Sequence, residues 1–147
     1  MAKPIYFFTK SDPYFELSNF YPQGFKEHDT YWPSVEHYFQ AMKFDDKEYR
    51  ERIRKASSPK QAKDLGRSRS IAIRSEWDTI RDEVMKHAIR KKFEDPQLRE
   101  ILLRTKRRTL IEKSPYDKYW GCGPDGRGKN RLGEILMEVR EECSVAT

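Results

Sequence analysis

The chain has 147 residues, which is enough for one domain with a hydrophobic core that needs no disulfide support. Its 30 Lys and Arg outnumber its 24 Asp and Glu, and the net charge of +6 attracts phosphate-bearing partners of any kind. The chain has only two cysteines and no apolar run near the ~20 residues that a transmembrane helix needs. We therefore expect a reduced, cytoplasmic single domain over residues 1–147, without membrane partners.

Short strands are predicted near the N-terminus. The β-branched and aromatic run at residues 5–8 is typical of a buried strand, and residues 25–31 favour a hairpin that leads into a helix. Between them, Asn19 stands among large apolar side chains. Its amide either faces a ligand or holds a turn through its own backbone.

The central segment, residues 31–44, combines five aromatic side chains with a few well-spaced polar groups. Ser34 is predicted to cap a helix, on which Glu36, Gln40 and Lys43 share one stripe while the other sides are mostly apolar. One interpretation is a buried helix whose charged groups are paired or line a cavity, because an isolated buried charge is strongly unfavourable. The other is a charged surface that faces water. The first makes Glu36 and Lys43 candidate catalytic residues.

Helices are predicted over most of the following chain, at residues 46–56, 60–65, 76–93 and 97–106, before a strand at 109–112. Gly66 is expected to end the second of these helices as a C-cap. The core face of the third is assigned to Trp77, Ile80, Val84, Ala88 and Phe93. The loop at residues 67–70, which carries Arg67, either binds a phosphate through its guanidinium groups or is solvated surface.

A glycine-rich segment covers residues 117–133 and formally matches two nucleotide-binding patterns. We reject both matches, because Asn130 stands where a P-loop needs Ser or Thr and too few residues follow to complete either fold. The glycines still allow backbone N–H groups to approach an anion or polar ligand, and Asn130 is expected to cap a final helix. The three histidines show no metal-ligand spacing, so neither a metal nor a cofactor is expected.

Two groups of motifs in this chain are similar to those of the NADAR family, also called the YbiA family. The motifs are residues 18–20, residues 32–34 followed by 36–41 and 43–44, and residues 119–121 with 128–133 and 136–137. Departures from the family pattern are Met42 where Gln is usual, Val35, and Cys122 in the glycine-rich segment. The resemblance implies an α+β domain, mostly helical with a small sheet, and N-glycosidase activity.

The substrates that the resemblance implies are ribosylaminopyrimidine phosphates of riboflavin synthesis, cleaved to ribose 5-phosphate and a pyrimidine base. Related members remove ADP-ribose from guanine in DNA, an alternative that the positive charge favours. A third hypothesis is a non-catalytic module that binds ADP-ribose or nucleotides. The sequence does not predict the oligomeric state.

Roles follow from the chemistry of cleaving a ribose C1–N bond. Glu36 is assigned to stabilising the positive charge on the sugar and positioning water, and Asp117 or Asp125 to protonating the leaving amine. Alternatively, Lys43 attacks the opened sugar and forms a Schiff base. Substrate contacts are assigned to aromatic, cationic, amide and glycine residues: Phe20, Trp32, Trp77, Trp120, Arg67, Lys129, Asn19, Asn130 and Gly121.

Overall fold

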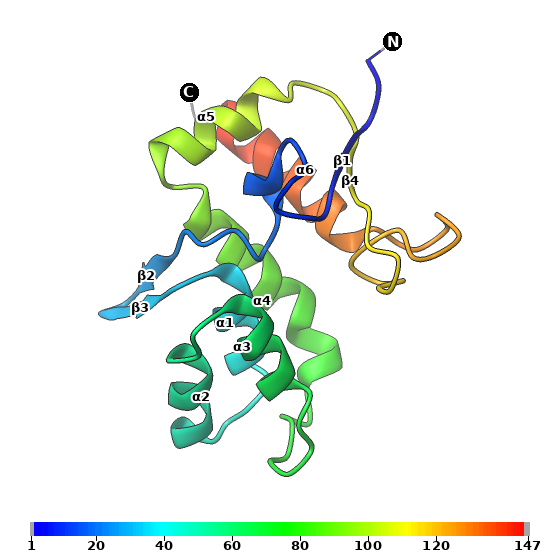
Figure 1. Cartoon of the computed structure of the whole chain (residues 1–147). Coiled ribbons are helices and arrows are strands. Elements are labelled where there is room, and N and C mark those ends of the chain that lie inside the picture. The colour runs from blue at the N-terminus through cyan, green and yellow to red at the C-terminus, as the bar shows by residue number, and fades with distance from the viewer. Residues whose placement is uncertain (1, 146–147) are drawn as a thin grey trace. The chain divides into compact units, whose positions relative to one another are not determined.

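The computed structural model describes residues 2–145, which contain six α-helices, one short 3₁₀ helix and two separate two-stranded sheets (Figure 1). This confirms the predicted α+β class, mostly helical, with the β structure divided between two small sheets. The chain divides into two compact units: unit 1, Met1–Tyr21 with Phe93–Thr147, and unit 2, Pro22–Lys92. The single domain over residues 1–147 stays a prediction.

In unit 1, a parallel pair of strands lies against helices. Strand β1 (Ile5–Phe7) pairs with β4 (Leu110–Glu112), with Ile5 opposite Leu110. Helix α6 (Arg131–Val145) packs on β4, and α5 (Pro96–Arg104) packs on α6 and on the 3₁₀ helix η1 (Phe15–Leu17) (Figure 1). The final helix that the sequence predicts is present as α6, and four of its apolar residues are buried: Leu132, Ile135, Leu136 and Val139.

In unit 2, helix α1 (Val35–Ala41) is the central element. It packs against α2 (Lys47–Arg54), α3 (Pro59–Gly66) and α4 (Trp77–Lys92), and every residue of it is buried. The antiparallel hairpin of β2 (Phe25–Glu27) and β3 (Thr30–Trp32) leads into α1, as predicted. The chain enters α1 through Ser34, whose Oγ accepts from the backbone N–H of His37 at 3.2 Å and so confirms the predicted N-cap.

Of two local predictions in this part of the chain, one is wrong and the other is right only in part. Gly66 is the last residue of α3 and not its left-handed cap; Arg67 is the cap, at φ −83°. The predicted core face of the third helix, α4, is right in part: Trp77, Ala88 and Phe93 are buried. Ile80 and Val84 stay partly exposed, and Met85 and Ile89 are buried instead. Tertiary packing therefore decides both positions. No helix within residues 2–145 has both the length and the apolar character that a bilayer span requires.

Candidate active site

Glu36 lies in the first turn of α1 and is buried, with 7% of its surface exposed. Gln40, one turn later, donates from Nε2 to Glu36 Oε2 at 2.6 Å. The free backbone N–H groups of a first helical turn also favour an anion. Of the two interpretations of the charged stripe, the buried one is therefore confirmed, and the water-facing one is wrong for Glu36 and Gln40.

Lys43 follows the C-terminal end of α1 and is only partly exposed. The pKa of Lys43 is lowered to about 8, chiefly by burial and also by the nearby charges of Arg69, Arg67 and Lys63, against the opposing effect of Glu36. A lysine with such a pKa is partly a free amine near neutral pH, which is the form that acts as a nucleophile.

Two backbone carbonyls in the last turn of α3 accept hydrogen bonds from side chains around the candidate site. Lys43 Nζ donates to the carbonyl of Gly66 at 3.4 Å, and Arg69 Nη1 donates to the same oxygen at 3.1 Å. The Tyr49 hydroxyl donates to the carbonyl of Leu65 at 2.5 Å. Carbonyls at a helix C-terminus lack intrahelical partners and attract cations, so this end of α3 holds two positive groups beside each other.

Sequence reasoning missed three contributors to this arrangement: Gln40 as the partner of Glu36, and Arg69 and Lys63 as charges that act on Lys43. The spacing of four residues between Glu36 and Gln40 is a signal that was available, because such residues face each other on a helix. The effect of Lys63 and Arg69 on Lys43 could not be predicted locally, because it depends on how α3 packs against α1.

His37 has a structural role next to Glu36. Its Nε2 lies 3.0 Å from the carbonyl of Ala56, and its Nδ1 lies 2.8 Å from Ser34 Oγ. Since a carbonyl only accepts, Nε2 carries the proton and Nδ1 accepts from the Ser34 hydroxyl. Burial lowers the pKa of His37, which favours this neutral form. The ring thus ties the start of α1 to the connection between α2 and α3.

The other predicted residues of unit 2 divide between core and surface. Trp77 is buried with its ring 5.1 Å from that of Phe39, and Trp32 is buried edge-on to Tyr38 at 5.3 Å. Both tryptophans therefore contribute to the core, and their contact with a heterocycle stays a prediction. Arg67 is exposed at the end of α3, where its charge acts on Lys43.

In unit 1, the two predicted proton donors hold turns. Asp117 Oδ1 accepts from the backbone N–H groups of Tyr119 at 2.9 Å and Trp120 at 2.7 Å. Asp125 is exposed, and its Oδ1 accepts from the N–H of Arg127 at 3.0 Å. Both carboxylates already accept backbone N–H groups of their own turns, so the structure adds no support for either residue as an acid.

Asn130 connects the glycine-rich segment to strand β4. Its Oδ1 accepts from the N–H of Glu112 at 2.9 Å, and its Nδ2 donates to the carbonyl of Leu110 at 2.8 Å. The expected side-chain cap of α6 is therefore wrong, because the amide bonds to a distant strand and the residue adopts φ 51°. Both ends of the amide already have protein partners, which weakens the assignment of Asn130 to substrate binding.

We expect Asn130→Ala to destabilise the protein by about 2 kcal/mol, because two strand groups lose their partner and Ala tolerates a positive φ poorly. The midpoint of urea unfolding measures this effect, with the exposed neighbour Arg127→Ala as the control. Unchanged stability combined with a raised KM would instead indicate that Asn130 contacts substrate.

The remaining predicted residues also lie in unit 1, and their roles in binding stay predictions. Trp120 is partly exposed and edge-on to Tyr119 at 4.8 Å, while Lys129 Nζ lies 5.6 Å from the Tyr119 ring centroid. The others differ in exposure: Asn19 and Gly121 are buried, and Phe20 is partly exposed.

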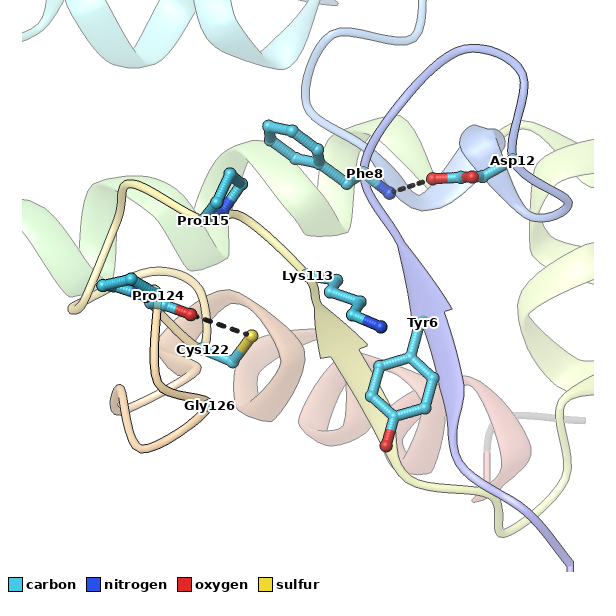
Figure 2. Close-up of a pocket in the computed structure, with 9 residues that line it drawn as sticks. Tyr6, Phe8, Asp12, Lys113, Pro115, Cys122, Pro124 and Gly126 are labelled. Carbon is cyan, nitrogen blue, oxygen red and sulfur yellow. Dashed lines mark hydrogen bonds between the residues drawn. The ribbon is translucent and has the colours of Figure 1, made fainter.

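A cavity of about 520 Å³ lies in unit 1 beside β1 and β4 (Figure 2). Lys113 Nζ lies 5.0 Å from the centroid of the Tyr6 ring in its wall, and Cys122 reaches it from the glycine-rich segment. Asp12 on its rim accepts from the N–H of Phe8 at 3.0 Å. None of the predicted site residues is among its lining residues, so the cavity does not mark the predicted catalytic site.

Comparisons with known proteins agree with the resemblance in the motifs. The model of the NADAR domain matches residues 6–144. N-glycosidase YbiA of Escherichia coli K12 is 46% identical over 142 residues, which cover 96% of this chain and 89% of that protein. A riboflavin biosynthesis protein of Vibrio vulnificus is 44% identical over 143 residues, or 97% of this chain and 39% of that protein. The NMR structure of E. coli YbiA has a TM-score of 0.90 at 46% identity, and the match covers 98% of this chain and 86% of that one.

Proposed function

Because the chain belongs to the NADAR family, we propose that it is an N-glycosidase that hydrolyses the C1–N bond of a ribosylaminopyrimidine 5-phosphate. The products are ribose 5-phosphate and the free pyrimidine. The enzyme class follows the name of the E. coli relative, and the pathway follows the name of the Vibrio relative. The pairing of a buried Glu36 with a partly desolvated Lys43 is the observation that carries the proposal.

Glu36 supplies the charge that the reaction requires. Cleavage of the C1–N bond develops positive charge on the ribose, which a fixed carboxylate stabilises most effectively where water is excluded. The 2.6 Å bond from Gln40 fixes the orientation of the carboxylate without neutralising it. Glu36 in this role also positions the water that attacks C1.

Lys43 offers a covalent route to the same products. In the ring-opened substrate, C1 is an imine carbon; the Lys43 amine adds to it, the aminopyrimidine leaves with a proton, and C1 becomes an imine of Lys43. Water then hydrolyses this imine, which releases ribose 5-phosphate and restores the amine. The pKa of about 8 supports this route, because much less of an ordinary lysine is unprotonated at neutral pH.

The cations at the C-terminal end of α3 suit the 5-phosphate. Arg67, Arg69 and Lys63 all act on Lys43 as positive charges, so the local potential favours an anion. A guanidinium binds phosphate through two parallel hydrogen bonds, which a substrate phosphate would accept. This supports Arg67 as a phosphate contact and adds Arg69 to it.

The test is to incubate the purified protein with freshly prepared ribosylaminopyrimidine phosphate and, in parallel, with DNA that carries ADP-ribosylated guanine. Mass spectrometry follows ribose phosphate and ADP-ribose, and Glu36→Gln is the control. We expect release of ribose 5-phosphate that the variant loses. Release of ADP-ribose from the DNA, without release of ribose phosphate, would indicate that the substrate is modified nucleic acid. Binding of either compound without any product would contradict the proposal that the protein is an enzyme.

A further inference from the structure

The backbone conformation at residue 66 does not require glycine, so another feature must explain why glycine stands there. Gly66 is the last residue of α3, and its φ lies outside the left-handed region that requires glycine. Helices generally favour alanine over glycine, so α3 itself gives no reason for a glycine here. The reason lies in the space that a side chain would occupy.

That space is filled by the amide of Gln40. A Cβ atom on Gly66 would lie 2.0 Å from Gln40 Oε1 and 2.8 Å from Gln40 Cδ, both far inside van der Waals contact. The neighbour is therefore the same amide that donates to Glu36 Oε2 at 2.6 Å. Gln40 is buried and cannot move aside without carrying its Nε2 away from the carboxylate.

The other side of the Gly66 peptide holds the second catalytic candidate. Its carbonyl accepts from Lys43 Nζ at 3.4 Å, and the same oxygen accepts from Arg69 at 3.1 Å. Gly66 thus lies against the Gln40 amide at its α-carbon, and its carbonyl oxygen accepts from Lys43 Nζ. A displacement of this peptide would change both catalytic groups together.

We infer that Gly66 is a positioning residue of the active site, which sets the orientation of Glu36 through the Gln40 amide while its carbonyl holds Lys43. The inference rests on the proposed N-glycosidase function for its catalytic consequence. Its structural part, the restraint on the Gln40 amide, is measurable without substrate.

The kinetic test is a double-mutant cycle between Gly66→Ala and Gln40→Ala. We expect Gly66→Ala to lower kcat on the order of 10²-fold with little change in KM, because a misoriented catalytic group slows the chemical step more than binding. In the Gln40→Ala background, where the Cβ meets no amide, Gly66→Ala should change kcat less than about 2-fold. An equal loss in both backgrounds would overturn the inference. Lys60→Ala, on the exposed side of α3, is the matched control and should retain wild-type kcat.

The substrate-free test follows hydrogen exchange of the Gln40 side-chain amide by NMR. We expect protection of this amide in the wild type and in Lys60→Ala, and its loss in Gly66→Ala. Equal protection in Gly66→Ala and the wild type would overturn the inference whatever the activity. A wild type that cleaves no substrate but shows the expected exchange would remove the proposed function and leave the restraint by Gly66 in place.

Folding of the variants is checked by circular dichroism. If Gly66→Ala does not fold, the comparison of Gln40→Ala with Gln40→Ala/Gly66→Ala carries the test, because the clash with the amide is absent from both. Only the contact of 3.0 Å between the new Cβ and the Cβ of residue 40 remains in the double variant. Equal kcat in these two variants supports the inference, and a lower kcat in the double variant contradicts it.

Discussion

Glu36→Gln is expected to abolish turnover, with kcat lowered by about 10³-fold or more, while the fold stays intact. The substitution preserves volume and leaves an oxygen for the Gln40 amide, so the hydrogen bond of 2.6 Å has a counterpart in the variant. What is lost is the negative charge, which no other group in α1 supplies. Steady-state kinetics with the pyrimidine substrate, together with a urea unfolding curve, measures both effects.

The matched control is Glu48→Gln, which makes the same change in the first turn of α2 at an exposed position. It should leave both kcat and stability near the wild-type values, because an exposed carboxylate contributes little. Near-normal turnover by Glu36→Gln would remove Glu36 from the catalytic role. A large loss of stability in that variant would instead give the carboxylate a structural role.

The second large effect concerns Lys43. On the covalent route, kcat/KM of the wild type should rise with pH and level off above about 8, the pKa to which burial and neighbouring cations lower this amine. The direction follows from the chemistry, since only the unprotonated amine attacks a carbon. A profile that falls as pH passes 8 would show that the ammonium is the working form.

Lys43→Arg distinguishes, at a single pH, a role of Lys43 as a nucleophilic amine from a role as a positive charge. It keeps the positive charge and a donor for the Gly66 carbonyl but cannot form an imine, so turnover should fall to the background level. Borohydride added during turnover should reduce the intermediate and leave the sugar phosphate attached to Lys43, which peptide mass spectrometry detects. The exposed Lys47→Arg serves as the control. Full activity of Lys43→Arg would exclude the Schiff base.

Local signals in the sequence predicted much of unit 2. Ser34 before an apolar helical pattern gave the start of α1, and the charged stripe on that helix gave Glu36 and Lys43 as a pair. These predictions depend on residues within two helical turns of one another. The family motifs added the N-glycosidase class, with which the names of the relatives agree.

The errors come from contacts that are distant in the sequence. Gly66 follows a helical pattern, where a local rule predicts a cap, but its neighbour in space is Gln40. Asn130 precedes a helix, where a local rule again predicts a cap, but its amide bonds to strand β4. In both cases the residue type is explained by a partner that no local pattern identifies.

The pairing of β1 with β4 has a consequence for how the chain is made. Ile5 and Leu110 are about a hundred residues apart, and the whole of unit 2 is encoded between them. During synthesis, unit 2 is complete when Lys92 has left the ribosome, whereas β1 must wait for its partner strand. Closing so long a loop carries an entropic cost that local contacts avoid. The segment with Glu36 and Lys43 is therefore free to fold first. Strand β1, although it is synthesised earlier, can pair only after β4 has been made.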